Sequence, residues 1–228
     1  MWNATVLSLF PDMFPGTLEF SIAGKALRNN LWSLKTVNIR HFSNDKNGKV
    51  DEAPFGGGPG MVINPEVLDK ALKSVSQEKG RRIYLSPRGK KFDQEFAKKL
   101  SKEKGAVFIC GRYEGVDERF LIYNDIEEIS VGDFVLSGGE IGAQLIMDAT
   151  VRLIPDVVGN AVGLMDESFE RHLLEYPLYT QPRVWNDMEV PEILLSGNHK
   201  EIQLWKLKMS EKLTQLRRPD LWLKYIKS

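Results

Sequence analysis

The sequence of 228 residues has little of what disulfide scaffolds, metal clusters and membrane spans require. A single cysteine, Cys110, excludes an intramolecular disulfide and a zinc site built from several thiolates. The three histidines are widely separated in the sequence, so we assign no residue to metal binding. The most apolar long segment, residues 134–154, contains Glu140, Asp148 and Arg152 and is too charged to cross a membrane.

An excess of either charge is also missing, because 31 Lys and Arg balance 31 Asp and Glu. Any contact with RNA or DNA must therefore come from local basic patches. With 42% hydrophobic and 27% charged residues, the composition is that of a folded globular chain and not of a disordered one. Residues 1–12 have no basic stretch before their apolar run, so they make a poor signal peptide. We expect a soluble protein of the reducing cytoplasm.

Short apolar runs alternate with amphipathic segments up to Pro155. This alternation is typical of an α/β fold with a parallel sheet. Strands are expected at residues 6–10, 34–39, 82–85, 106–110 and 126–131, with a short extended piece at 134–136. Helices are expected at 18–27, 65–75, 92–100, 116–122 and 140–153.

The pattern changes beyond Pro155. Residues 156–182 show no sustained period, and the chain reads as helical from Pro191 onward. Residues 176–228 are mildly basic. We therefore expect an α/β catalytic domain over residues 1–160, a mobile linker over 161–176 and a small helical domain over 177–228.

Three glycine-bearing turns follow the ends of expected strands, at residues 86–89, 111–115 and 132–139. Ligands of open α/β sheets bind outside the carboxyl ends of the strands, so these turns predict one pocket. The third turn mixes glycine, aspartate and apolar residues, which suits a flat ligand such as an adenosine. Strand-to-helix turns with no ligand remain the alternative for the second and third turns.

A further glycine-rich segment, PFGGGPGM at residues 54–61, lies in a long irregular stretch. It has neither the Gly-Lys-Ser/Thr of a phosphate-binding P-loop nor the third glycine of a dinucleotide fingerprint. A ligand-contacting loop and a tight structural loop are both open. The adjacent carboxylates Asp166 and Glu167, and Arg152 near a helix end, would by themselves be read as solvated charge.

Five motifs occur together and in this order: PFGGGPGM, YLSPRG, GRYEGVDER, SVGDFVLSGGE and LLSGNHKEI…LRRPDL. With them the chain resembles, over nearly its whole length, the bacterial tRNA (guanine-N1)-methyltransferase family of the SPOUT superfamily. The resemblance implies methyl transfer from S-adenosylmethionine to N1 of guanosine 37, beside the anticodon. It also implies a deep trefoil knot in the α/β domain, a homodimer with active sites at the subunit interface, and a helical domain that helps to hold the tRNA.

The resemblance implies two sets of binding residues. Those near the target base are Gly57, Gly58, Pro59, Gly60 and Met61. Those that bind S-adenosylmethionine are Tyr84, Leu85, Ser86, Pro87, Gly111, Tyr113, Glu114, Gly115, Ser130, Val131, Gly132, Asp133, Phe134, Val135, Leu136, Gly138 and Gly139.

The resemblance assigns Arg152 to the charge that develops on guanine O6 and a carboxylate before Ser-Phe to the N1 proton. That position holds Glu167, whereas the family has aspartate there, and Asp166 is the alternative base. Gly142 stands where the family has proline. The family's activity has been linked to Mg²⁺, for which Glu114 is a candidate. Alternatives are a ribose 2′-O-methyltransferase, a non-catalytic RNA-binding protein and an adenine-nucleotide enzyme.

Overall fold

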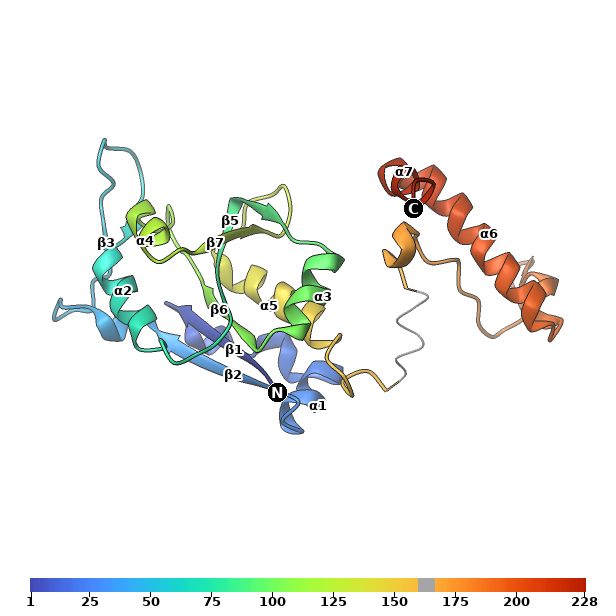
Figure 1. Ribbon diagram of the computed structural model, residues 1–228, viewed down its shortest axis with the longest axis horizontal. Helices are drawn as coiled ribbons and strands as arrows, with labels where there is room; N and C mark the ends of the chain where they lie inside the picture. The colour runs from blue at the N-terminus through green and yellow to red at the C-terminus, as the bar shows by residue number, and fades with distance from the viewer. Residues whose placement is uncertain (160–166) are drawn as a thin grey trace. The chain divides into compact units, whose positions relative to one another are not determined.

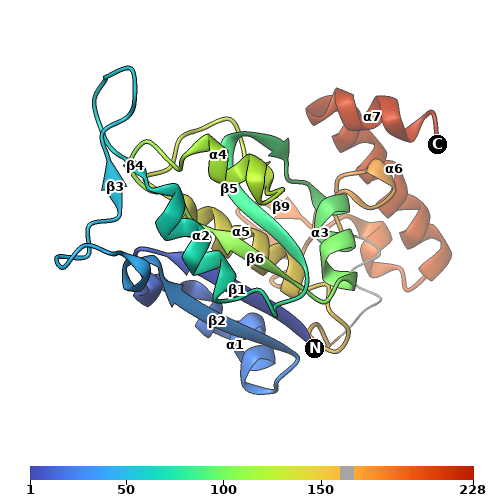
Figure 2. The ribbon, with the colours of Figure 1, turned by 60° about the vertical axis from the view of Figure 1, so that its left-hand side comes forward.

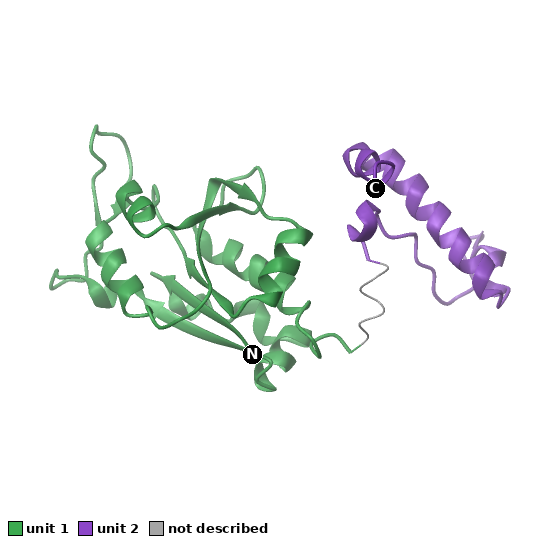
Figure 3. Cartoon of the chain, in the orientation of Figure 1, with its two compact units in different colours: residues 1–159 green, residues 160–228 purple. Residues whose placement is uncertain are grey.

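The computed structural model describes residues 1–159 and 167–228. The chain divides into two compact units, residues 1–159 and 160–228 (Figure 3). Each unit is described by itself. The separate linker expected over residues 161–176 stays a prediction.

A five-stranded parallel sheet forms the centre of the first unit (Figure 1). Its strand order is β2-β1-β6-β5-β7, and every pair of neighbours is parallel. The predicted α/β class is thereby confirmed. The strands are β1 (Trp2–Ser8), β2 (Trp32–Asn38), β5 (Arg81–Lys91), β6 (Gly105–Ile109) and β7 (Glu127–Ser130).

Helices cover both faces of this sheet. In the view of Figure 2, α2 and α4 lie in front of it and α5 lies behind it. The helices of this unit are α1 (Ser21–Arg28), α2 (Pro65–Lys73), α3 (Gln94–Lys102), α4 (Glu118–Tyr123) and α5 (Gly139–Val151). The predicted start of α2 is confirmed: the Asn64 side chain accepts a hydrogen bond from the Glu66 N–H, and Pro65 occupies the first turn, where no N–H is needed.

Strand β6 shows why the core has two layers. All five of its residues are buried, and successive side chains of a strand point to opposite faces. Ala106 and Phe108 join the core cluster that contains α5, whereas Val107 and Ile109 join the cluster that contains α2. A fully apolar strand is therefore what a sheet covered on both faces requires.

The structure extends two predicted strands. Strand β1 begins at Trp2 and not at residue 6, because it pairs with β2 from Trp2 onward and with β6 from Asn3 onward. The buried Trp2 indole also donates a hydrogen bond to the Leu100 carbonyl. Strand β5 continues to Lys91 through the turn expected at 86–89, with a shift of register against β7 between Leu85 and Lys90. The extended piece expected at 134–136 is not a strand.

Short elements were missed by the sequence patterns. Strands β3 (Asp51–Glu52) and β4 (Val62–Ile63) pair antiparallel at the two ends of the glycine-rich loop. In the second unit, β8 (Val184–Trp185) and β9 (Met188–Glu189) form a hairpin.

The second unit is built on α6 (His199–Arg217) and α7 (Pro219–Tyr225). The segment after residue 167 packs on these helices: the Leu174 N–H donates to the Thr214 hydroxyl, 2.8 Å away, and Leu173 and Leu221 are buried. Among the helices that the structure describes, none has the length and apolarity of a membrane span.

Candidate functional site

The three glycine-bearing segments surround one cavity of about 260 Å³, which lies beside the middle of β5 and at the carboxyl ends of β6 and β7. Every residue that the sequence assigned to S-adenosylmethionine, except Asp133, lines it. Four lining residues were not assigned: Arg112, Ile129, Ser137 and Gly142. Arg112 and Ser137 lie inside the recognised motifs, so their position next to assigned residues could have predicted them.

Tyr84 forms the floor between the first and second turns. Its ring is buried, and burial, followed in importance by the charge of Glu128, raises the pKa of its hydroxyl. A Cβ on either Gly111 or Gly115 would lie 2.8 Å from that hydroxyl. Backbone without side chains therefore forms this part of the wall, because any larger residue would collide with the tyrosine.

The second and third turns are joined through backbone. The Gly139 N–H donates to the Gly111 carbonyl, 3.0 Å away, and a Cβ on Gly139 would lie 2.8 Å from Cys110 Cα. Within the third turn, the Ser130 hydroxyl and the Gly132 backbone exchange hydrogen bonds. These contacts fix the wall that faces the cavity without filling it.

The glycine-rich loop at 54–61 lies against the second turn. The Glu114 N–H donates to the Met61 carbonyl at 2.9 Å, and a Cβ on Gly60 would lie 2.4 Å from the Glu114 side chain. Since Glu114 also lines the cavity, the loop borders the predicted donor site. Residues 55–60 are exposed, and nothing lies within 4 Å of a Cβ built on Gly57 or Gly58.

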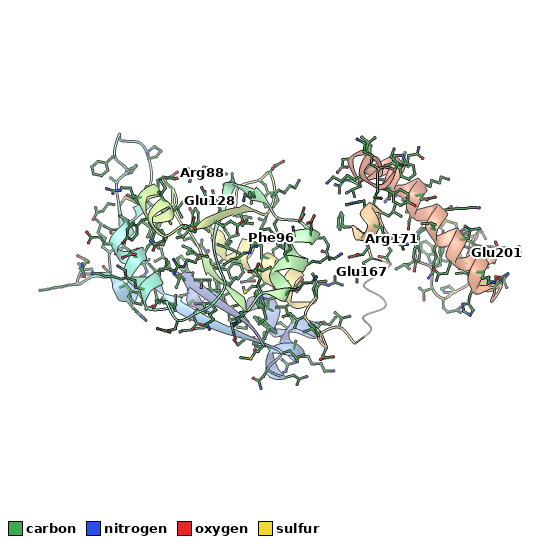
Figure 4. All side chains as sticks on the ribbon, in the orientation of Figure 1. Arg88, Phe96, Glu128, Glu167, Arg171 and Glu201 are labelled. Atoms are coloured by element: carbon green, nitrogen blue, oxygen red, sulfur yellow. The ribbon has the colours of Figure 1, made fainter. Side chains whose placement is uncertain are left out.

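An exposed ion cluster braces the first turn. Arg88 contacts Glu118 of α4 at 2.8 Å and Glu128 of β7 at 3.1 Å. Arg88 and Glu128 are labelled close together in Figure 4, on the neighbouring strands β5 and β7. The hydrogen bond to Glu118 is the main cause that raises the pKa of Arg88. Surface pairs of this kind contribute little stability, about 0–1 kcal/mol.

The predicted catalytic residues occupy different units. Arg152 is the C-cap of α5 in the first unit and is partly buried. Glu167 lies in the second unit, where its carbonyl accepts the Glu170 N–H (Figure 4). Asp166 lies outside the described residues. The meeting of Arg152 with either carboxylate stays a prediction.

Comparison with known proteins decides the family. A model of the family described as tRNA (Guanine-1)-methyltransferase TrmD matches residues 2–224. The chain belongs to this family. It is similar to the tRNA (guanine-N(1)-)-methyltransferase of Pelagibacter ubique, with 52% identity over 228 residues and 100% of both chains covered. The enzyme of the same name from Rhodospirillum rubrum is 52% identical over 224 residues, covering 98% of this chain and 94% of the relative.

Membership in the TrmD family confirms the recognition and the predicted activity, that of a tRNA (guanine-N1)-methyltransferase. The roles of individual residues in the cavity stay predictions. Gly142, the departure from the expected proline, lines the cavity one turn into α5, and a Cβ there would lie 3.3 Å from Leu85. That distance is tight but leaves room for a slight shift of a flexible side chain.

The second unit of this TrmD-family chain has its own cavity of about 340 Å³ between the segment 167–176 and α6. Arg171 and Lys206 line it, and the Lys206 ammonium lies 4.5 Å from the centre of the Tyr176 ring. Over residues 1–159 and 167–228, no three His, Cys, Asp or Glu side chains gather as metal ligands. Glu114 as a Mg²⁺ ligand stays a prediction.

Proposed function

We propose that the chain transfers the methyl group of S-adenosylmethionine to N1 of guanosine 37 in tRNA, with the donor bound in the cavity of the three turns. The cavity is the observation that carries this proposal. It gathers, from three separate segments of the chain, all of the residues that the family's motifs predict for the donor except Asp133. Family membership supports methyl transfer to a tRNA guanine.

The cavity suits this donor by shape and chemistry. Its volume of about 260 Å³ approaches the lower end of the range for small-ligand sites, roughly 300–1,000 Å³. Glycine backbone at 111, 115 and 139 offers flat walls that a planar base can approach. Apolar lining from Leu85, Val131 and Leu136 matches the faces of an adenine. When bound, the donor supplies a methyl group on a positively charged sulfur.

The side chains of this chain would then act on the guanine. A carboxylate must accept the N1 proton, and we assign this to Glu167, with Asp166 as the alternative. The longer glutamate side chain places its oxygens one methylene further from the backbone than the family's aspartate. Arg152 would hold the negative charge that develops on O6 as the proton leaves. The loop 54–61, which borders the cavity at Glu114, would contact the target base.

We further propose a cytoplasmic homodimer whose active site is completed at the subunit interface, with the trefoil knot of the superfamily in the first unit. An apolar strip supports the dimer: Ile141 is 57% and Leu145 43% exposed, one turn apart on α5. Helix residues four apart share a face, so both would be covered together by a second copy. A monomeric mass by light scattering at micromolar concentration would contradict this.

The test is transfer of tritiated methyl groups to transcribed tRNAs that carry G or A at position 37. We expect labelling of the G37 transcript only, and nucleoside mass spectrometry should place the methyl group on the base. A methyl group on ribose would instead support the 2′-O-methyltransferase alternative. No heat on titration with S-adenosylmethionine would contradict the proposed donor site.

Amide variants test the assignment of the base. Glu167→Gln should reduce the rate of methyl transfer about 10²–10⁴-fold if this carboxylate accepts the proton. Asp166→Asn should have the larger effect if the alternative holds. Glu175→Gln removes the same charge from the same segment and serves as the matched control. Full activity in the double variant of Asp166 and Glu167 would refute proton removal by this segment.

A further inference from the structure

A completely buried carboxylate lies behind the cavity and has no part in the proposed proton transfer. Glu140 is the second residue of α5, and none of its side chain is exposed. Burying a charge is costly unless partners compensate it. The N-terminus of α5 favours a negative charge, and the remaining compensation comes from two side chains distant in the sequence.

These two partners come from different strand ends. The Ser8 hydroxyl, at the end of β1, donates to Glu140 Oε1 at 2.7 Å. Arg112, which follows β6, brings its Nε to 2.9 Å from Glu140 Oε2. This second contact is an ion pair without the alignment of a hydrogen bond, because neither atom has a hydrogen-bond partner within the described residues. Glu140 thus connects β1, β6 and the start of α5.

Arg112 carries this connection into the wall of the cavity. Its Nη1 donates to the Ser137 carbonyl at 3.3 Å, and its guanidinium lies 4.6 Å from the centre of the Phe10 ring. A Cβ on Gly138 would lie 2.4 Å from Arg112 Nε, so the guanidinium packs directly on the backbone of the third turn. Arg112 and Gly138 both line the cavity.

We propose that Glu140 is a positioning residue for the methyl donor, which acts by holding Arg112 and thereby sets the spacing between the second and third turns of the cavity. This inference rests on the proposed function, since it assumes that the donor binds there. Stability alone would not require the pair, because well-packed apolar residues in place of a buried ion pair are often equally stable. A charged pair that spans two binding turns instead fixes their geometry.

The deciding measurement is calorimetric titration of S-adenosylmethionine into the full chain and its variants. Glu140→Gln keeps the shape of the side chain and removes its charge. It should raise the Kd of the donor about 10- to 100-fold, by analogy with the loss found when a group that orients a metal-ligating residue is removed. In methyl-transfer kinetics the KM for the donor should rise in parallel, while the KM for tRNA stays unchanged.

A double-variant comparison shows whether Glu140 acts through Arg112. Arg112→Met should raise the donor Kd at least as much as Glu140→Gln. The combination of both should raise it no further than Arg112→Met alone, since residues in one network are not additive. Glu78→Gln is the matched control, because it removes a carboxylate from a surface pair with Lys35 (2.9 Å) and should leave the Kd unchanged.

Ser8→Ala covers the case in which Glu140→Gln does not fold. It removes the hydrogen bond to Glu140, together with the one that the hydroxyl accepts from the Phe10 N–H, and leaves the ion pair with Arg112 in place. It should raise the donor Kd severalfold, and by less than Glu140→Gln, because the charged pair that holds Arg112 remains. Native donor affinity in the folded variants, or full additivity of the Arg112 and Glu140 effects, would overturn the inference. If the unmodified chain itself gives no heat with the donor, the proposed function fails instead.

Discussion

The two units of the chain are stabilised in different ways. Among the described residues, nearly all buried hydrophobic side chains belong to the first unit, whereas the second contributes only Leu173 and Leu221. The second unit relies on polar contacts such as Thr214 with Leu174, and it exposes large apolar side chains, including Trp185 and Leu178. A small unit with so little dry core has a small stability margin.

The comparison suggests a division of labour. The first unit holds a preformed cavity on a rigid sheet, where a small donor needs fixed walls. The second unit keeps most of its described apolar side chains at the surface and has few that are buried. The difference in stabilisation between the two units can be tested by substitutions that remove either a buried side chain of the first unit or a polar contact of the second.

The largest effect is expected in the first core. Phe108→Ala removes a ring from β6 that is completely buried. The lost burial and the resulting cavity should lower the free energy of unfolding by about 3–5 kcal/mol. Denaturant unfolding of the full chain measures this loss. A cost below 1 kcal/mol would show that the sheet does not carry the stability we assign to it.

A smaller effect is expected at the polar contact of the second unit. Thr214→Val keeps the shape of the side chain but leaves the Leu174 N–H without its acceptor. The free energy of local opening should fall by about 1–2 kcal/mol. Hydrogen exchange of the amides of α6 measures this opening, and Thr214→Ser, which retains the hydroxyl, should behave like the native chain.

The pH dependence of the second unit should reveal a surface pair. Arg218 lies 2.6 Å from Asp220 and lowers the pKa of that carboxyl from 3.8 to about 2. A lowered pKa in the folded state stabilises the fold above pH 3.8, and this contribution is lost as the pH falls toward 2. NMR titration should show the low pKa, and Arg218→Met should return it toward 3.8. An unchanged pKa in that variant would exclude Arg218 as the cause.

The smallest effect is expected at an exposed aromatic residue. Trp185 is 62% exposed in the β8–β9 hairpin. Trp185→Ser should change the free energy of unfolding by less than about 0.5 kcal/mol, as at other surface positions. Thermal unfolding in the absence of RNA checks this. A large loss would mean that the hairpin has a core of its own, which would weaken the contrast between the units.

Local patterns predicted those parts of the fold that local physics determines. Helix α2 follows from Asn64 and Pro65, and β6 follows from its uninterrupted apolar run. The β8–β9 hairpin could also have been predicted from the sequence, although it was missed. Its turn needs positive φ values at both central residues, and Asn186 and Asp187, which adopt φ values of 48° and 58°, are residue types that tolerate this conformation well. The strands on either side of this turn have only two residues each, too few to show the alternating pattern of a strand.

The candidate site was predictable only in part. Motifs indicated the three turns and most of the lining, but the contact between Ser8 and Glu140 joins residues 132 positions apart. No periodicity or spacing predicts which distant side chain compensates a buried charge. The extension of β5 was missed for a related reason, because the second half of the strand depends on its pairing with β7 and not on its own sequence.

The glycine-rich loop has one more consequence. Gly57 and Gly58 have φ values of 79° and 118°, a region that L-residues rarely adopt, although space around them is open. The loop thus requires glycine at these positions because of the positive φ values and not because a larger side chain would lack space. In a chemically synthesised chain, D-alanine at either position would accept the native backbone and restrict its freedom before the substrate arrives.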